Sequence, residues 1–418
     1  MMRISNFFNS LGPGILLAAT AIGVSHLVQS VQAGAKYGLL FILFIIIAHV
    51  TKYPFFEIAP RYSSVTKRSL LHGYNKLNKN YLIIYLLITL ISIFTFLSAV
   101  TVVAAGIFAN VFKIGLDIKS SSIIVLLFCY IILVLGKYKL LDKGIKYIIL
   151  LLTLSSIIAL ILAFTSSEIA LKKTVPSFSF SNKLDIIFLI GFLGWMPAPL
   201  DCAIWNSIWI TEKNKNQNGE TSYKKSLIDF RTGFFTTAFL GVIFLLLGYI
   251  MFYGTDNILP NKSIDFVSTL LELYTKSLGS WSYYLIGLTA FITMFSTVIT
   301  CVDGYPRTIT KSLKLLFFEN KNKICNEEKL YVYILTISVL FTGLTILFFV
   351  SNMMKLIMVA TVISFLTTPI IAILNLRLIS DKSYPAKYRP RKAFFYFSYL
   401  CLAILLTLTI WFIFTQLN

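Results

Sequence analysis

The sequence predicts an all-α polytopic membrane protein with about eleven transmembrane helices in a single domain over residues 1–418. The chain is 57% hydrophobic and only 13% charged, which excludes a water-soluble globule. Apolar runs of roughly 20 residues, enough to cross about 30 Å of hydrocarbon, recur along nearly the whole sequence. Short basic segments separate these runs, so no stretch remains for a soluble domain.

Apolar runs bounded by charged residues place the helices along the chain. The first run follows Arg3 and resembles a secretory signal, but it continues past signal-peptide length, so we expect it to be retained as the first helix. The predicted spans are approximately 11–35, 37–58, 81–111, 120–136, 145–165, 185–210, 229–254, 282–312, 331–350, 354–376 and 394–415.

The net charge of +20 indicates membrane topology here and not nucleic-acid binding, because most of the 37 Lys and Arg residues lie in alternate short loops. This asymmetry predicts a cytoplasmic amino terminus. Abundant Ile, Lys and Asn are compatible with an AT-rich bacterial genome, and hence with the bacterial inner (plasma) membrane. The basic loops are 61–79, 137–146, 213–231, 307–329 and 377–392.

Two predicted spans carry helix-breaking residues. The first has Gly-Pro-Gly at residues 12–14 and Gly-Val-Ser-His at residues 23–26, and the sixth has Met-Pro-Ala-Pro at residues 196–199. Proline removes a backbone donor and clashes with the preceding turn, so both spans should unwind at mid-depth. Backbone groups freed in this way must line a cavity.

The two breaks occupy corresponding places in two blocks of five helices. An odd number of spans per block inverts the second block, an architecture of secondary transporters that hold substrate between broken helices at the midplane. We predict inverted repeats at about 11–165 and 185–376, with an additional helix at about 394–415.

The first helix resembles that of the natural resistance-associated macrophage protein (Nramp) family. In that family GPG opens the helix and QAGA with a nearby glycine closes it, as residues 12–14, 32–35 and 37–38 do here. Residues 196–197 look like the start of the family's MPHN motif. The resemblance implies a leucine-transporter-like fold and, usually, proton-coupled uptake of manganese, iron or related divalent metals.

The same resemblance implies metal ligands from a DPGN motif in helix one, and a methionine sulfur and a backbone carbonyl in helix six. Aligning on QAGA places Gly23, Ser25 and His26 at the D, G and N positions of DPGN. Met196 keeps its place in MPHN, whereas Ala198 stands at the histidine. A buried divalent cation needs electron-pair donors and preferably negative charge. Because Gly23 supplies neither charge nor a side-chain donor, the family's usual transition-metal site is degenerate here.

Two substrate classes remain open for this site. Metal binding would rest on His26 and Met196, assisted by Ser25 and by Asp201 just beyond the second break. Alternatively, loss of the carboxylate and the positive ends of half-helices favour a small anion such as bicarbonate. Either ion would be coupled to a proton or to sodium.

Further polar residues are candidates for coupling or gating. Gln29 and Gln32 share a helix face and would line a path, or Gln32 bonds between helices. In helix two, His49 and Glu57 offer a proton path, although an ion pair of Glu57 with Arg61 and snorkelling of Lys52 to the interface are the simpler interpretation. Asp303 lies at a gate or at the inner end of its helix.

Other function classes fit less well. The sequence has no HExxH, GxSxG or Walker motif, so we expect no enzyme and no cofactor. A channel remains a remote alternative, because it does not need two symmetrically placed helix breaks. The five cysteines show no CxxC pair or metal-ligand spacing and are expected to be core thiols: Cys129, Cys202, Cys301, Cys325 and Cys401.

Overall fold

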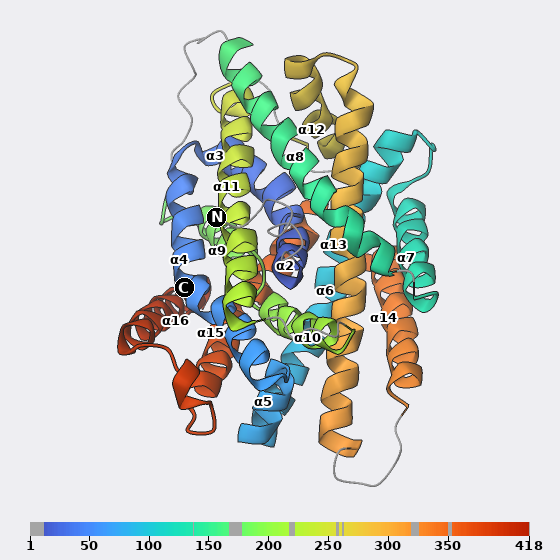
Figure 1. Ribbon diagram of the computed structural model, residues 1–418. Coiled ribbons are helices and arrows are strands. Elements are labelled where there is room, and N and C mark those ends of the chain that lie inside the picture. Colours follow the sequence, from blue (N-terminus) through green and yellow to red (C-terminus); the bar gives the residue numbers. More distant parts are fainter. Residues whose placement is uncertain are drawn as a thin grey trace.

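The protein is an all-helical bundle (Figure 1). The computed structural model describes residues 12–136, 138–166, 178–216, 222–255, 259–260, 263–318, 326–349 and 353–417. Within these ranges the regular structure is helical throughout, which confirms the predicted class. Arg3 and Cys325 lie outside the described residues, and the other four cysteines are buried thiols, as expected.

Seven helices are long and apolar enough to cross a membrane. Each matches a predicted span within the softness of its boundaries, because apolar residues continue over the 18 or more positions that hydrocarbon requires. They are α4 (Leu40–Thr66), α6 (Lys79–Phe112), α11 (Tyr223–Phe252), α13 (Ser282–Leu313) with its π-helical extension η2 (Lys314–Phe318), α14 (Glu327–Phe349), α15 (Met353–Ser380) and α16 (Lys392–Leu417).

The first predicted span is broken. Helix α2 (Pro13–Ala21) ends before the π-helix η1 (Ser25–Ser30), which leads directly into α3 (Val31–Tyr37). The two halves are bent by 45° relative to each other, and together they are long and apolar enough to cross a membrane as an eighth span. The break falls at Ile22–Val24, where the glycine-containing sequence predicts it.

The sixth predicted span is also interrupted. Helix α9 (Lys183–Trp195) and helix α10 (Asp201–Asn216) are separated by residues 196–200. Neither Pro197 nor Pro199 has a backbone N–H to continue the ladder of α9, which explains the stop. The prediction of an unwound segment is therefore confirmed here too.

Shorter helices complete the described chain. Helix α7 (Ile118–Val134) and the apolar part of α8 (Tyr138–Ser166) match two predicted spans. Helix α5 (Leu70–Leu77) lies in the predicted basic loop 61–79, and helix α12 (Ser263–Leu278) lies between two predicted spans where the sequence predicts no helix. Both are amphipathic, with apolar residues at adjacent and i+4 positions buried on one face, so packing makes them helical. The 3₁₀ turn η3 (Ala386–Tyr388) precedes α16.

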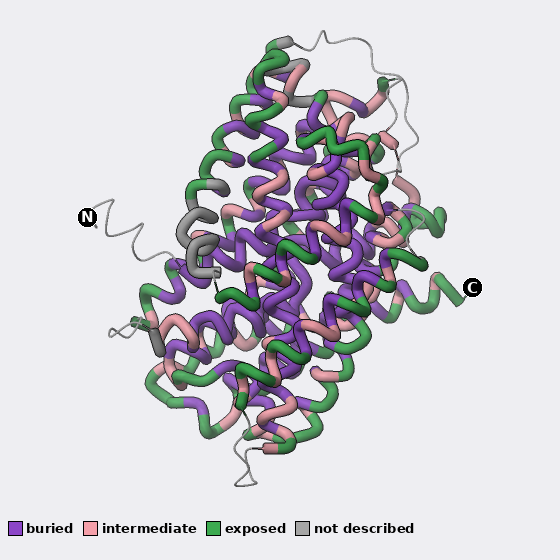
Figure 2. The backbone as a smooth tube through the Cα atoms, turned by 90° about the vertical axis from the view of Figure 1, so that its right-hand side faces the viewer, coloured by how far each residue is buried: buried purple, intermediate pink, exposed green. Residues whose placement is uncertain are grey.

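Glycines allow the first span to lie against α11. A Cβ atom on Gly14 would come within 2.3 Å of the Asp229 carbonyl oxygen, and one on Gly34 within 1.9 Å of that of Leu245. The GPG and QAGA segments thus hold both halves of the broken span on one partner helix. Figure 2 shows the buried interior, whereas α16 buries only 22% of its apolar window, as expected for a lipid-facing helix.

Candidate functional site

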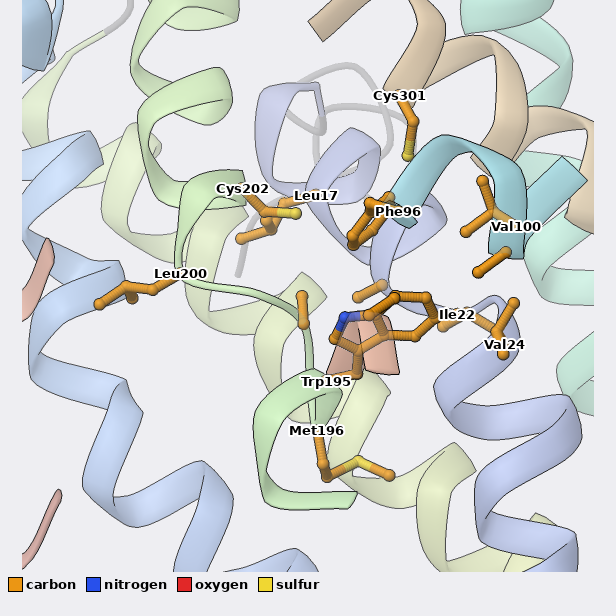
Figure 3. Packing of buried hydrophobic residues seen from close by; sticks show 14 of the residues in the cluster. Leu17, Ile22, Val24, Phe96, Val100, Trp195, Met196, Leu200, Cys202 and Cys301 are labelled. Atoms are coloured by element: carbon orange, nitrogen blue, oxygen red, sulfur yellow. The ribbon is translucent and has the colours of Figure 1, made fainter. Parts of the chain in front are cut away.

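The two breaks meet at a small cavity of about 10 Å³ whose lining residues are buried. This is about the space of one water-sized probe. Figure 3 shows Trp195 and Phe96 between the segments, with Ile22 and Val24 to one side and Leu200 to the other. Helices α6 and α13 close the remaining walls. The lining residues are Thr20, Ala21, Val24, Ser25, Phe96, Val100, Trp195, Ala198, Pro199 and Thr297.

A much larger vestibule of about 490 Å³ lies on the side of the bundle where α3 ends. Gln29 and Gln32 both line it, as expected for residues that share a helix face. Gln32 also contacts the Met354 sulfur at 3.1 Å, so it bonds between helices as well. Gln29 lies four residues beyond Ser25 on η1, and the vestibule therefore ends one helical turn from the small cavity.

Ser25 and His26 form a buried hydrogen-bonded pair. The Ser25 hydroxyl lies 2.8 Å from His26 Nδ1 and 2.9 Å from the Ala21 carbonyl oxygen. His26 Nε2 lies 2.9 Å from the carbonyl oxygen of Thr237 on α11. A carbonyl only accepts hydrogen bonds, so in the neutral ring Nε2 carries the proton and Nδ1 is an acceptor, and the single proton of the Ser25 hydroxyl goes either to Nδ1 or to the Ala21 carbonyl. Both nitrogens of His26 are thus engaged.

His49 on α4 contacts the same threonine. Its Nε2 lies 3.2 Å from the Thr237 hydroxyl, and its Nδ1 lies 2.8 Å from the Ile45 carbonyl oxygen. His26 and His49 are therefore linked through Thr237, which joins η1, α4 and α11. The sequence identified both histidines, but Thr237 lies in an ordinary apolar run and gave no signal.

Met196 and Ala198 both belong to the unwound segment. The sulfur of Met196 lies close to Gly241 of α11, on the far side of the chain from Trp195 (Figure 3). Trp195 donates to the Ser364 hydroxyl at 2.9 Å. No group of three or more His, Cys, Asp and Glu residues in the described ranges is placed to hold a metal ion. Metal ligation by Met196 and His26 stays a prediction.

Lys52 does not snorkel to the interface, and that interpretation is wrong. The residue is 1% exposed, and its ammonium donates to the carbonyl oxygens of Gly194 at 2.7 Å and Ala198 at 3.2 Å. These acceptors exist because α9 ends beside them. The sequence around Lys52 in α4 does not indicate a partner 142 residues away, so sequence reasoning missed this contact.

Asp201 is the first residue of α10 and is buried. Its carboxyl group interacts electrostatically with Tyr74, Tyr85 and Tyr305, from α5, α6 and α13. The Tyr85 hydroxyl is within hydrogen-bonding reach of this carboxyl group, whereas Oδ1 and the Tyr305 hydroxyl have no close hydrogen-bond partner within the described ranges. Several other buried side-chain atoms in the described ranges also have no partner, so a functional role of Asp201 stays a prediction.

Glu57 and Asp303 both lie in ion pairs and contact a second helix: Glu57 pairs with Arg231 of α11, whereas the ion pair of Asp303 is within α13. Glu57 accepts from Arg61 at 2.7 Å and from Arg231 of α11 at 3.3 Å, and it also contacts Tyr53. The expected pair with Arg61 is present, and Arg231 is the partner that the sequence did not indicate. Asp303 accepts from Arg307 at 2.6 Å and from Tyr331 of α14 at 2.6 Å.

Gly23 packs directly against α13. A Cβ atom at this position would lie 2.9 Å from both Cγ2 and Oγ1 of Thr297. The Thr297 hydroxyl in turn donates to the Ala19 carbonyl at 3.1 Å, near the end of α2. A larger side chain at residue 23, such as the aspartate of DPGN, does not fit beside Thr297 as it stands.

Comparison with known proteins gives both a family and a relative. The family model "Natural resistance-associated macrophage protein-like" matches residues 14–415. The chain is 34% identical over 378 residues to the uncharacterized protein PM0681 of Pasteurella multocida. That alignment covers 89% of this chain and 85% of the relative.

Solved structures show the same fold at low sequence identity. The manganese transporter of Eremococcus coleocola superposes with a TM-score of 0.72 at 13% identity, covering 97% of this chain and 86% of that one. MhsT, solved in complex with L-phenylalanine, gives 0.63 at 15% identity over 95% and 97%. The leucine-transporter-like fold is thus confirmed. With its family match over nearly the whole length, the chain belongs to the Nramp family of membrane transporters.

Proposed function

We propose that this chain is a secondary active transporter of a small inorganic ion, bound between the breaks of the first and sixth spans. The observation that carries this proposal is the buried cavity of about 10 Å³ between the two unwound segments, one helical turn from a vestibule of about 490 Å³. Its size suits a single small ion or water and excludes an organic substrate in this conformation.

Alternating access is supported by the unequal closure of the two ends. The vestibule is open on the side where α3 ends. On the opposite side, the Asp229 carboxylate accepts from the N–H groups of Gly12 and Gly14 at 3.0 and 2.8 Å, and Glu57 and Asp303 hold ion pairs. With the amino terminus in the cytoplasm of a bacterium, as the loop charges predict, this conformation faces outward across the inner membrane.

A divalent metal is the substrate class that the family implies. The first structural neighbour is a manganese transporter, and its fold covers 97% of this chain. Met196, His26 and carbonyl groups of the unwound segment would supply soft and neutral donors. Such a site lacks a carboxylate, so we expect weaker metal binding or altered selectivity.

A small anion is the second candidate, favoured by one observation. None of the residues that line the vestibule or the buried cavity is acidic, whereas Lys52 bonds to Ala198 of the cavity wall; Lys36, which lines the vestibule, is paired with Asp185 at 3.3 Å. A lysine next to the binding site costs less electrostatic free energy when the bound ion is an anion than when it is a divalent cation. Bicarbonate fits this chemistry.

For coupling we propose Asp201 as the proton-carrying group. Its oxygen Oδ1 has no partner within the described ranges, so protonation there breaks no hydrogen bond. The Tyr85 hydroxyl contacts the same carboxyl group, and the nearby Tyr305 hydroxyl, which is unpaired within the described ranges, can pass a proton through water. Sodium coupling is the alternative that the same experiment distinguishes.

The test is ion flux into proteoliposomes that contain the purified chain. Manganese, magnesium and bicarbonate are compared under imposed proton and sodium gradients, with empty liposomes as the background. Saturable manganese entry supports a rebuilt metal site, and a bicarbonate-dependent change in internal pH without metal flux supports the anion. Absence of gradient-driven flux for every ion, in protein that remains folded, contradicts the proposal.

A further inference from the structure

The unwound segment after α9 leaves carbonyl groups that a continuous helix would have paired. The Gly194 carbonyl would accept from the N–H of residue 198 in such a helix, but the chain departs from helical geometry at Met196. The Ala198 carbonyl is not part of the α10 ladder either, whose first backbone bonds go to Pro199 and Leu200. Two buried acceptors therefore face the gap between α9 and α10.

These acceptors form the kind of site that holds a monovalent cation. Broken helices of transporters coordinate coupling cations with unwound carbonyls and with the negative ends of half-helices. Gly194 lies at the carboxyl end of α9, where the partial charge of the helix is negative. The geometry of the break alone would thus attract a cation such as sodium.

In this chain a side chain occupies the site. The ammonium nitrogen of Lys52 lies 2.7 Å from the Gly194 oxygen and 3.2 Å from the Ala198 oxygen, with the whole residue only 1% exposed. Among the described residues it forms no ion pair with Asp or Glu. Its charge is balanced by carbonyl dipoles, as the charge of a bound metal ion would be.

We propose that Lys52 is a built-in cation: its ammonium occupies the carbonyl site of the sixth-span break and takes the place of a monovalent coupling cation there. The proposal concerns this carbonyl site and holds for either substrate class. It predicts that the wild-type chain needs no sodium at this position. It also predicts that removing the side chain creates a site for sodium or for a small alkylammonium ion.

The experiment measures thermal unfolding of purified Lys52→Ala in detergent against rising concentrations of sodium or methylammonium chloride. Choline chloride controls for ionic strength, because choline is too large for the vacated space. The matched control variant is Thr51→Val, the adjacent buried residue of α4, whose hydroxyl bonds only to its own helix. Lys52→Met fills the space without charge.

The expected result is a melting temperature of Lys52→Ala below that of the wild type, raised in a saturable way by about 2 to 5 °C with sodium or methylammonium and not with choline. Lys52→Met is destabilised and does not respond, and Thr51→Val responds like the wild type. Folded Lys52→Ala without a cation response overturns the proposal, as does wild-type stability of Lys52→Met.

If Lys52→Ala does not fold, Lys52→Arg and Lys52→Met decide the question by their yield of monodisperse protein. If Lys52 is a built-in cation, the Lys52→Arg variant should yield folded protein and the Lys52→Met variant little, because only arginine keeps the positive charge. Equal yields from the two variants overturn the proposal. None of these readouts requires a known substrate, so their failure is distinct from a failure of the proposed transport.

Discussion

The imidazole of His26 is held by the backbone of α11, with Nε2 lying 2.9 Å from the Thr237 carbonyl oxygen. This contact fixes the tautomer, because Nε2 must donate to the carbonyl and leaves Nδ1 to face Ser25. Ser25 lines the buried cavity between the two breaks. A group that binds in the cavity through the Ser25 hydroxyl is therefore coupled to α11 through a single histidine ring.

We expect His26→Ala to lower flux of the transported ion by about 10-fold or more. The variant loses the hydrogen bonds that hold Ser25 and η1 in place against α11. The Thr237 carbonyl loses its partner, which costs roughly 1–3 kcal/mol of stability and leaves the protein folded. Proteoliposome flux and circular dichroism measure the two effects. His72→Ala, on α5 away from both breaks, is the control, and unchanged rates in His26→Ala would remove His26 from the site.

Restoring a carboxylate with Gly23→Asp is expected to destabilise the protein by about 1–3 kcal/mol, because the new Cβ lies 2.9 Å from Thr297. Combining it with Thr297→Ala removes both clashing atoms, so the double variant should be more stable than the sum of the single variants predicts. Thermal unfolding of the four proteins gives this coupling, and additive effects would show that Thr297 is not the obstacle.

The same double variant tests the substrate. A carboxylate at residue 23, next to the first break, supplies the charge that a divalent metal needs, so manganese binding by calorimetry should be tighter than in the wild type. The uncharged pair Gly23→Asn with Thr297→Ala controls for shape. Equal manganese affinity in the two double variants would mean that residue 23 does not face the ion.

The helices and their breaks follow from the sequence, because both depend on local signals. Apolar runs of span length placed the long helices, and the two prolines after Met196 placed the second break. The amphipathic helices α5 and α12 were missed because their short apolar faces become helical only when they pack on α6 and its neighbours.

The candidate site could be predicted from the sequence only in part, for a different physical reason. His26, Asp201 and Met196 stand out as polar or irregular residues in apolar segments. Thr237, Thr297 and the carbonyl partners of Lys52 do not, because backbone acceptors and membrane threonines acquire a role only through tertiary contact. Lys52 lies in the second half of the predicted span 37–58, where a lysine is interpreted as an interface residue until the break beside it is known.

Glu57→Gln should loosen the closed side of the protein. The carboxylate joins α4 to α11 by accepting from Arg61 and Arg231, and its removal leaves two guanidinium groups without their counter-charge. We expect a lower melting temperature and a loss of roughly 1–3 kcal/mol, less than for a fully buried pair because Arg231 is half exposed. Glu328→Gln, an exposed residue of α14, is the control. Identical melting curves for the two variants would show that the Glu57 cluster does not close this side.

Asp201→Asn should separate transport from its driving force. The amide keeps the size of the side chain but does not carry a proton, so flux down the substrate's own gradient should persist while stimulation by an imposed pH gradient is lost. Proteoliposomes with and without a pH gradient measure, in one preparation, both the flux down the substrate's own gradient and its stimulation by the pH gradient. Asp117→Asn is the matched control, since that exposed carboxylate caps α7 away from the site. Retained stimulation by the pH gradient in Asp201→Asn would exclude Asp201 as the coupling group, and stimulation by a sodium gradient in the wild type would assign coupling to that cation.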